Sequence, residues 1–205
     1  MKLNPAAFNA HLNHMGQRFS LRRSHACPCL DQGQPQQDCI HCSGKGRLWD
    51  DGIDGVAGIV ARLEAKKYAL FGVWDDGDIL LSIPSDSALY QMGQYDRVTA
   101  LDKREPFSVN IVHGLNDELK FRVTDVESVY WIDGVHLVQG HVPTVNTDGT
   151  LTWVVAPPAG KTFALTGKRM PEYYCFQEIP IDRPEQSGAA LPRRVALRRF
   201  DLFGL

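Results

Sequence analysis

The sequence predicts a mainly β protein, an antiparallel β-barrel or sandwich with an N-terminal helix and a small cysteine-rich loop. Eight or more short apolar segments are separated by Gly, Asp and Asn turns, with little helical periodicity between them. Asp-Gly pairs, which are strong hairpin signals, stand at Asp76-Gly77, Asp133-Gly134 and Asp148-Gly149. Four of the five cysteines lie together ahead of this β-rich part.

The first expected element is a helix that begins at Asn4-Pro5, a pair typical of an N-cap and a first helical position. Four apolar residues then recur at i, i+4, i+7 and i+11: Phe8, Leu12, Met15 and Phe19. We expect them to form one stripe that packs against the body of the protein. A free helix that binds a partner is the alternative.

The second expected element is a loop held by Cys27-Pro28-Cys29 and Cys39-Ile40-His41-Cys42. Two thiolate pairs facing each other can close a tetrahedral shell around one Zn²⁺ at about 2.3 Å from each sulfur. Residues 30–38, between the pairs, are almost without apolar side chains, so this loop cannot build a core of its own. We therefore predict a structural zinc that staples the loop, with the ligands Cys27, Cys29, Cys39 and Cys42.

The glycines after the last cysteine support this prediction. Gly44 and Gly46 can adopt a positive φ, which turns the backbone so that its N–H groups donate to a bound sulfur. His41 is the first substitute if one cysteine is not a ligand, and His25 is another histidine beside the ligands.

Disulfides, other metals and free thiols are the alternatives to zinc. The chain begins Met1-Lys2-Leu3-Asn4 without a secretory leader, so we expect a reducing cytosol, where disulfides are rare. A C-x-C pair is also badly spaced for bonding to itself.

Beyond the loop the apolar period becomes that of strands. Strands are expected at residues 56–61, 67–74, 79–83, 97–101, 107–113, 119–123, 126–132, 135–139, 142–146, 151–155 and 162–166. Residues 170–181 form an aromatic, extended segment that is expected to help close the sheet. Cys175 within it is interpreted as a buried, inert thiol, because no activating base can be placed beside it.

The last expected element is a basic C-terminal segment with Arg193, Arg194, Arg198 and Arg199. Its arginines flank apolar residues, as in a final edge strand whose charges block edge pairing. A surface arm that grips another subunit fits the same pattern, and both interpretations stay open.

Three parts follow: a helix plus zinc loop at 1–50, a β body at 51–182 and a basic arm at 183–205. Residues 1–49 carry a net charge of +4 and residues 183–205 carry +3, so the middle carries −9. Basic ends on an acidic body indicate nucleic-acid contact, docking onto an acidic neighbour, or folding back onto the body. The ends lack interleaved aromatic residues, which disfavours the first of these.

The sequence contains no motif of an enzyme. It lacks nucleophile-elbow, zinc-protease, phosphate-loop and dinucleotide-binding patterns, so no catalytic residue can be named. No apolar run approaches about 18 residues, so a membrane span is not expected.

The cysteine segment, Cys27-Pro28-Cys29 followed by Asp38-Cys39-x-x-Cys42-x-Gly44-x-Gly46, resembles a segment of structural proteins from tailed bacteriophages. Those proteins lie at the neck, where the portal meets the tail, as head-tail connector, head-completion or stopper components. Three later stretches look similar too: Tyr95-Asp96-Arg97-Val98, Pro171-Glu172-Tyr173-Tyr174 and residues 191–199. The resemblance covers most of the chain, although related proteins often have C-x2-C as their first pair.

This resemblance implies a β-barrel or sandwich body, self-association in a ring on the portal, and an inner surface facing packaged DNA. We therefore expect a non-enzymatic virion protein, assembled in the cytoplasm of the host bacterium, whose partners are portal, tail or other neck proteins. A zinc-ribbon nucleic-acid-binding module is the alternative, although this loop is neutral to acidic. A metal-linked hydrolase is a second rival and requires an open coordination position.

Overall fold

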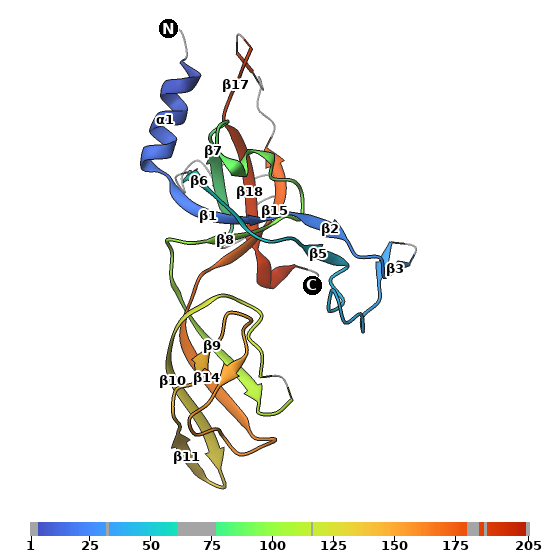
Figure 1. Ribbon diagram of the computed structural model, residues 1–205, viewed down its shortest axis with the longest axis vertical. Coiled ribbons are helices and arrows are strands. Elements are labelled where there is room, and N and C mark those ends of the chain that lie inside the picture. The colour runs from blue at the N-terminus through green and yellow to red at the C-terminus, as the bar shows by residue number, and fades with distance from the viewer. Residues whose placement is uncertain are drawn as a thin grey trace. The chain divides into compact units, whose positions relative to one another are not determined.

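The computed structural model describes residues 4–31, 33–60, 77–115, 117–179, 185–186 and 188–203. It confirms the predicted mainly β fold with an N-terminal helix (Figure 1). The chain forms two compact units. We call them the barrel unit (Met1–Asp102 with Glu172–Leu205) and the insert unit (Lys103–Pro171).

Six antiparallel strands close the barrel unit into a barrel. Their order is β1 (Gln17–Arg22), β6 (Ile53–Ile59), β7 (Ile79–Ile83), β18 (Arg193–Arg199), β15 (Glu172–Ile179) and β8 (Arg97–Ala100). β8 pairs again with β1, so three consecutive strands and a returning fourth form a Greek key. The expected late strand at 170–181 is confirmed as β15, which pairs with both β8 and β18.

The barrel interior is an apolar core to which every barrel strand contributes. Its fully buried members include Phe19, Leu81, Ile83, Val98, Val195 and Leu197. Cys175 lies in the same core and is 2 % exposed, as its interpretation as a buried thiol predicted. Burial raises the pKa of this thiol to about 12, so it stays protonated and inert at neutral pH.

The helix α1 (Pro5–Met15) is shorter than predicted. It is capped by Asn4, whose side chain accepts a hydrogen bond from the Ala7 N–H, and it ends before Gly16. Phe19 therefore belongs to β1 and lies in the barrel core, not on the helix. The strand pattern that begins at Gln17 overrides the apparent helical period.

The expected packing of the helix stripe is confirmed only in part. Leu12 is half-buried, and its Cδ2 atom lies close to Gly58 of β6. Phe8 and Met15 are 42 % and 68 % exposed, whereas the polar Asn9 is buried. Asn9 donates to the Ser85 Oγ at 2.7 Å and accepts from the Ser85 N–H at 3.3 Å, which satisfies its side chain against the barrel unit.

The barrel crosses both boundaries that the sequence suggested. β1 comes from residues 1–50 and β18 from residues 183–205, yet both are barrel strands. The C-terminal segment is neither an edge strand nor an arm, because β18 pairs with β7 on one side and β15 on the other. Only a completed barrel brings these distant segments together, so the sequence pattern alone could not reveal it.

Short elements complete the barrel unit. The cysteine loop contains the pairs β2 (Ser24–Ala26) with β5 (Arg47–Trp49) and β3 (Leu30–Asp31) with β4 (Gln34–Pro35). The remaining elements are β16 (Glu185–Gln186), β17 (Ala189–Ala190) and the 3₁₀ turns η1 (Ala88–Gln91) and η2 (Phe200–Leu202).

The insert unit contains one antiparallel sheet in the order β11 (His136–Gln139), β10 (Val123–Asp133), β14 (Thr162–Arg169) and β9 (Glu105–Val112). A hairpin of β12 (Thr144–Val145) and β13 (Leu151–Thr152) accompanies this sheet. The buried side chains of the insert unit form a core of their own: Phe107, Ile111, Leu119, Val129, Phe163 and Leu165.

Most of the expected strands of the insert unit are present. Gly134 and Gly149 have φ values of 59° and 89°, which confirms the two turns predicted from their Asp-Gly pairs. The strand expected at 119–123 is wrong, because β10 begins at Val123. Ahead of it lies the isolated bridge Glu118↔Thr150, and the Leu119 N–H donates to the Gly149 carbonyl at 2.9 Å.

The expected strand at 67–74 and Asp76 lie outside the described residues. Among the described residues, no helix has the length and apolar character needed to cross a membrane.

Candidate metal centre

The cysteine loop is part of the barrel unit and connects the barrel strands β1 and β6. The pairing of β2 with β5 closes its base. The Cys27 N–H donates to the Gly46 carbonyl at 2.9 Å just beyond this pair. The two ends of the loop are thus held together before the first cysteine, which brings the two cysteine pairs face to face.

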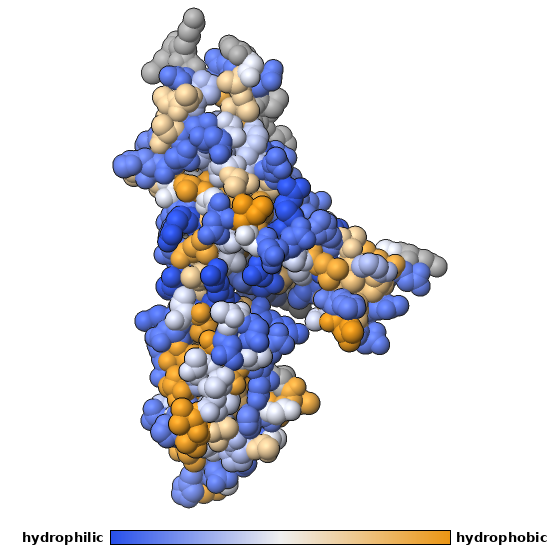
Figure 2. All heavy atoms as spheres, viewed as in Figure 1, coloured by the Kyte–Doolittle hydropathy of each residue, from blue (hydrophilic) through white to orange (hydrophobic). Residues whose placement is uncertain are grey.

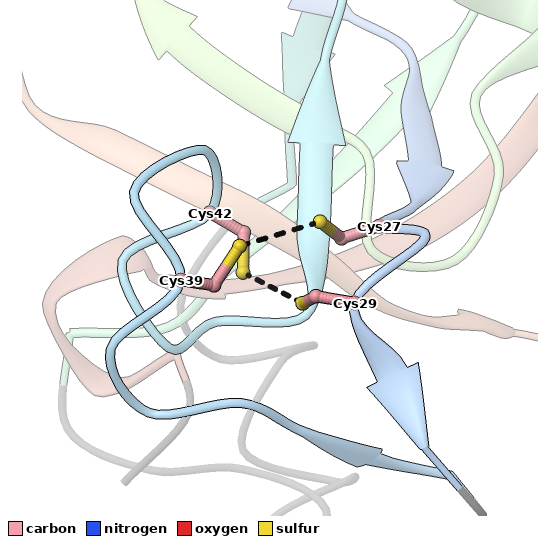
Figure 3. Close-up of side chains that lie close together, drawn as sticks. All are labelled: Cys27, Cys29, Cys39 and Cys42. Atoms are coloured by element: carbon pink, nitrogen blue, oxygen red, sulfur yellow. Dashed lines mark hydrogen bonds between the residues drawn. The ribbon is translucent and has the colours of Figure 1, made fainter.

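Four sulfur atoms converge at the head of the loop (Figure 3). The Sγ atoms of Cys27, Cys29, Cys39 and Cys42 all lie within 4.8 Å of one another. Cys27 and Cys39 have their sulfurs 3.9 Å apart, and Cys29 and Cys42 have theirs 3.5 Å apart. Four sulfurs around one ion at about 2.3 Å would be roughly 3.8 Å apart, so these four cysteines can hold a metal ion.

The glycines have the role that the sequence predicted. Gly44 and Gly46 have φ values of 76° and 68°, and the Gly46 N–H donates to the Cys42 Sγ at 3.3 Å. A Cβ at Gly44 would lie 3.1 Å from the Gln37 carbonyl oxygen, and at Gly46 it would meet Leu30 and Pro35 at 3.1 Å. The turn under the sulfur therefore requires glycine for both its φ and its space.

Backbone hydrogen bonds favour the thiolate form of Cys39, which is the form that binds a cation. Hydrogen bonds from the backbone of Cys42 and His41 lower the pKa of the Cys39 thiol to about 6. Burial, followed by hydrogen bonds with the neighbouring thiols, raises the pKa of the Cys29 thiol to about 12. Four thiolates cannot coexist at this spacing without a positive charge among them, and a metal ion held by the four sulfurs would supply that charge.

Disulfides are not formed between these cysteines. The sulfur separations of 3.5 and 3.9 Å are far longer than a bond of about 2.05 Å. Neither histidine belongs to the sulfur group found among the described residues. His25 pairs instead with Asp50 at 2.7 Å, and His41 lines a pocket beside Cys27, Cys29 and Cys39.

Aromatic and basic side chains attach the loop to the rest of the barrel unit. The Lys45 Nζ donates to the Phe203 carbonyl at 3.0 Å and lies 5.4 Å from the centre of the Phe200 ring. The Trp49 indole N–H donates to the Tyr95 carbonyl at 3.0 Å. The Arg47 guanidinium lies 4.4 Å from the centre of the Tyr95 ring.

The sequence patterns did not predict these attachment residues. The signal that could have found two of them is the alternation of Arg47 and Trp49, which places both on one face of β5; Lys45 precedes the turn at Gly46. Their partners come from the C-terminal end and from the turn before β8, which no local pattern could supply.

The four arginines of the C-terminal segment lie on β18, and ion pairs hold this segment within the barrel unit. Arg193 pairs with Glu178 at 2.8 Å, Arg198 with Asp78 at 3.2 Å, and Arg199 with Asp201 at 3.6 Å. Arg194 lies half-buried on the same strand. The basic end therefore folds back onto acidic residues, which is one of the three arrangements that the charge distribution indicated.

Arg198 also stacks on an aromatic ring, with its guanidinium carbon 4.1 Å from the centre of the Phe176 ring. Asp78 in its ion pair is almost fully buried, which ties this arginine to the barrel. The structure assigns no partner molecule to these arginines, so their role in binding stays a prediction.

Comparison with protein-family models and with curated proteins identifies no relative of this chain: no family model matches the sequence, and no curated protein does. The similarity to phage neck proteins consequently stays a hypothesis based on residue patterns, while the four-cysteine centre is a property of the fold itself.

Proposed function

We propose that this chain is a structural subunit of a tailed-bacteriophage neck, a head-tail connector that joins portal and tail, and that its loop holds a structural zinc. The observation that carries this proposal is the group of four sulfurs, all within 4.8 Å, at the head of a loop without its own core. A shell of four protein sulfurs leaves no coordination position for a substrate or a reactive water. The centre therefore suits a structural role better than the hydrolase alternative.

Zinc is the metal that this donor set favours. Four sulfur ligands in a tetrahedron are typical of zinc or of iron-sulfur centres. The loop also provides the backbone N–H donor that a zinc-bound thiolate requires, from Gly46 to Cys42. Elemental analysis of the purified protein distinguishes zinc from iron.

The mechanism of such a subunit is mechanical. Metal binding fixes the turn between Cys39 and Cys42, and this turn presents Ile40, which is 88 % exposed, with Pro28 exposed nearby. An apolar residue on a rigid turn is a suitable anchor for a neighbouring virion protein. The exposed Phe8 and Met15 of α1 offer a second surface for contacts within a ring.

The zinc-ribbon alternative is less well supported by charge. Between Cys27 and Gly46 the loop carries Asp31, Asp38 and one basic residue, Lys45. The Lys45 ammonium is engaged by the Phe203 carbonyl. Duplex binding depends on basic side chains that face phosphates.

Native mass spectrometry of the purified protein, with and without chelator, tests the proposal. We expect each subunit to carry one zinc and part of the protein to form cyclic oligomers or to bind a portal-type protein. A metal-free chain, or a monomer that binds duplex DNA at physiological salt, would contradict it. In the second case the affinity should fall steeply as salt rises.

A further inference from the structure

The insert unit carries an apolar surface on the hairpin of β10 and β11. Ile132 and Leu137 lie directly opposite each other on the two strands and are 62 % and 70 % exposed. Val135 in the turn between them is 92 % exposed. Figure 2 shows apolar side chains gathered along this hairpin. Exposed apolar groups of this kind are typical of an interface.

The second strand of this hairpin, β11, is an edge strand of the sheet. β11 lies at one end of the sheet and pairs only with β10 among the described residues. The Gly140 N–H donates to the Val129 carbonyl, so Gly140 and Val129 form a hydrogen-bonded pair. From there, pairs without and with backbone hydrogen bonds alternate along the hairpin. This alternation makes Leu137 and Gln139 the residues whose backbone N–H and C=O groups point away from β10.

The opposite edge of the sheet is protected. The His113 N–H donates to the Lys161 carbonyl, and the same alternation makes Pro106 and Val112 two of the outward residues of β9. Pro106 has no N–H, and the Val112 carbonyl already accepts from the Leu115 N–H. β11 contains no proline, so its edge lacks the protection that the β9 edge has.

Charge indicates which occupant suits the β11 edge. β11 contains no Lys, Arg, Asp or Glu, and the nearby Asp133 is paired with Lys161 at 3.2 Å. A basic or acidic partner would find no opposite charge here, whereas a second copy meets no like-charge repulsion. The surface is thus complementary to itself.

We propose that two copies of this chain associate through antiparallel pairing of their β11 strands. Leu137 then lies opposite the partner's Gln139, and Val138 lies on the two-fold axis. This register uses all the outward N–H and C=O groups of both strands and joins two four-stranded sheets into one. The inference stands on the insert unit and does not depend on the connector role or on the metal.

Sedimentation velocity of the 205-residue chain over a range of concentrations tests this pairing. We expect the wild type to form a dimer whose share rises with concentration, beside any ring that other surfaces of the chain form. Gln139→Pro removes an outward N–H, and Leu137→Lys adds a charge to the apolar surface. Each should weaken dimerisation about tenfold or more.

Leu115→Lys is the matched control, because Leu115 is 80 % exposed in the insert unit but lies in a loop away from β11. It should leave the dimer unchanged, and far-UV circular dichroism checks that every variant folds. A wild type that stays monomeric at the highest soluble concentration overturns the proposal. A dimer that neither β11 variant weakens overturns it equally.

Cross-linking tests the register separately. Residues at the two-fold axis form a pair without hydrogen bonds, with Cα atoms about 4.5 Å apart, a distance that a disulfide spans. Val138→Cys in the zinc-loaded chain should therefore oxidise to a covalent dimer, and Leu115→Cys should not. A Val138→Cys protein that cross-links no more than the control contradicts this register.

Discussion

The barrel and the cysteine loop belong to one compact unit but are stabilised by different means. The barrel buries side chains such as Phe19, Leu81 and Leu197 completely, so its stability comes from apolar surface removed from water. In the loop, Cys27 and Cys42 are the buried residues that meet at its head, at 3 % and 4 % exposure. The loop therefore depends on what its sulfurs bind.

This difference has a thermodynamic meaning. The stability of the barrel is set by the chain alone, whereas a metal held by the four sulfurs would stabilise the loop to an extent that rises with its free concentration, by mass action. The two regions should consequently respond to different perturbations. The four variants below are ordered by their expected effect on the free energy of unfolding of the barrel, the largest first.

Leu197→Ala should have the largest effect. Leu197 is fully buried in the barrel core, and truncation of such a leucine costs about 2–5 kcal/mol because it leaves a cavity. Urea unfolding followed by far-UV circular dichroism measures the loss, with Val135→Ala at a position 92 % exposed as the control. A loss below about 1 kcal/mol would mean that the core can collapse around the cavity.

Arg97→Ala should come second. The Arg97 guanidinium pairs with Glu172, with side-chain exposures of 13 % and 9 %, and lies 4.1 Å from the centre of the Phe200 ring. Its removal leaves the buried Glu172 carboxylate without a cation, although the Thr99 hydroxyl still donates to it at 3.4 Å, and should cost about 3 kcal/mol. The same urea experiment applies. The double variant Arg97→Met with Glu172→Leu should recover most of the lost stability. If it recovers none, the unpaired carboxylate is not the cause of the loss.

Cys39→Ser should separate the two regions. Losing one of four sulfur ligands should release the metal, lower the melting temperature, and expose the amides of residues 27–46 to hydrogen exchange. The amides of β7 and β18 should stay protected, because the barrel core does not contain the loop. Unchanged exchange in the loop would show that the sulfurs do not hold it. Ile40→Ser is the control, because Ile40 is exposed in the same turn and its substitution removes no sulfur.

Lys45→Met should have the smallest effect on the barrel. It removes the hydrogen bond to the Phe203 carbonyl and the cation above the Phe200 ring, which together contribute about 1 kcal/mol. Zinc stoichiometry should be unchanged, whereas the fluorescence of the neighbouring Trp49 should shift as the loop loosens. Loss of metal from this variant would mean that the attachment and the metal centre act as one.

The sequence reveals the metal centre more completely than the barrel. C-x-C, C-x-x-C and the two glycines are local patterns, and each constrains its own few residues, so the sulfur group was predictable. The Asp-Gly turns at Gly134 and Gly149 were predictable for the same reason. Local patterns of this kind need no information from distant parts of the chain.

Long-range pairing was not predictable in this way. Phe19 fits both a helical stripe and a strand, and only its burial among β6 and β8 decides between them. β18 resembles an exposed edge because its arginines are charged. Arg198, however, pairs with Asp78, which lies 120 residues away in sequence, and Arg193 pairs with Glu178 on the neighbouring strand β15. Tertiary contacts override the local pattern in both cases.

The points at which the chain leaves the barrel suggest that the barrel can be separated from its insertions. Thr99 on β8 is paired with Glu172 on β15, where the insert unit departs and returns, and Leu21 on β1 is paired with Ile53 on β6 across the cysteine loop. Glu105 and Arg169 pair in turn at the base of the insert unit. Replacing 103–171 by a short glycine linker should therefore leave a foldable minimal barrel, onto which other loops can be grafted at the same two strand ends.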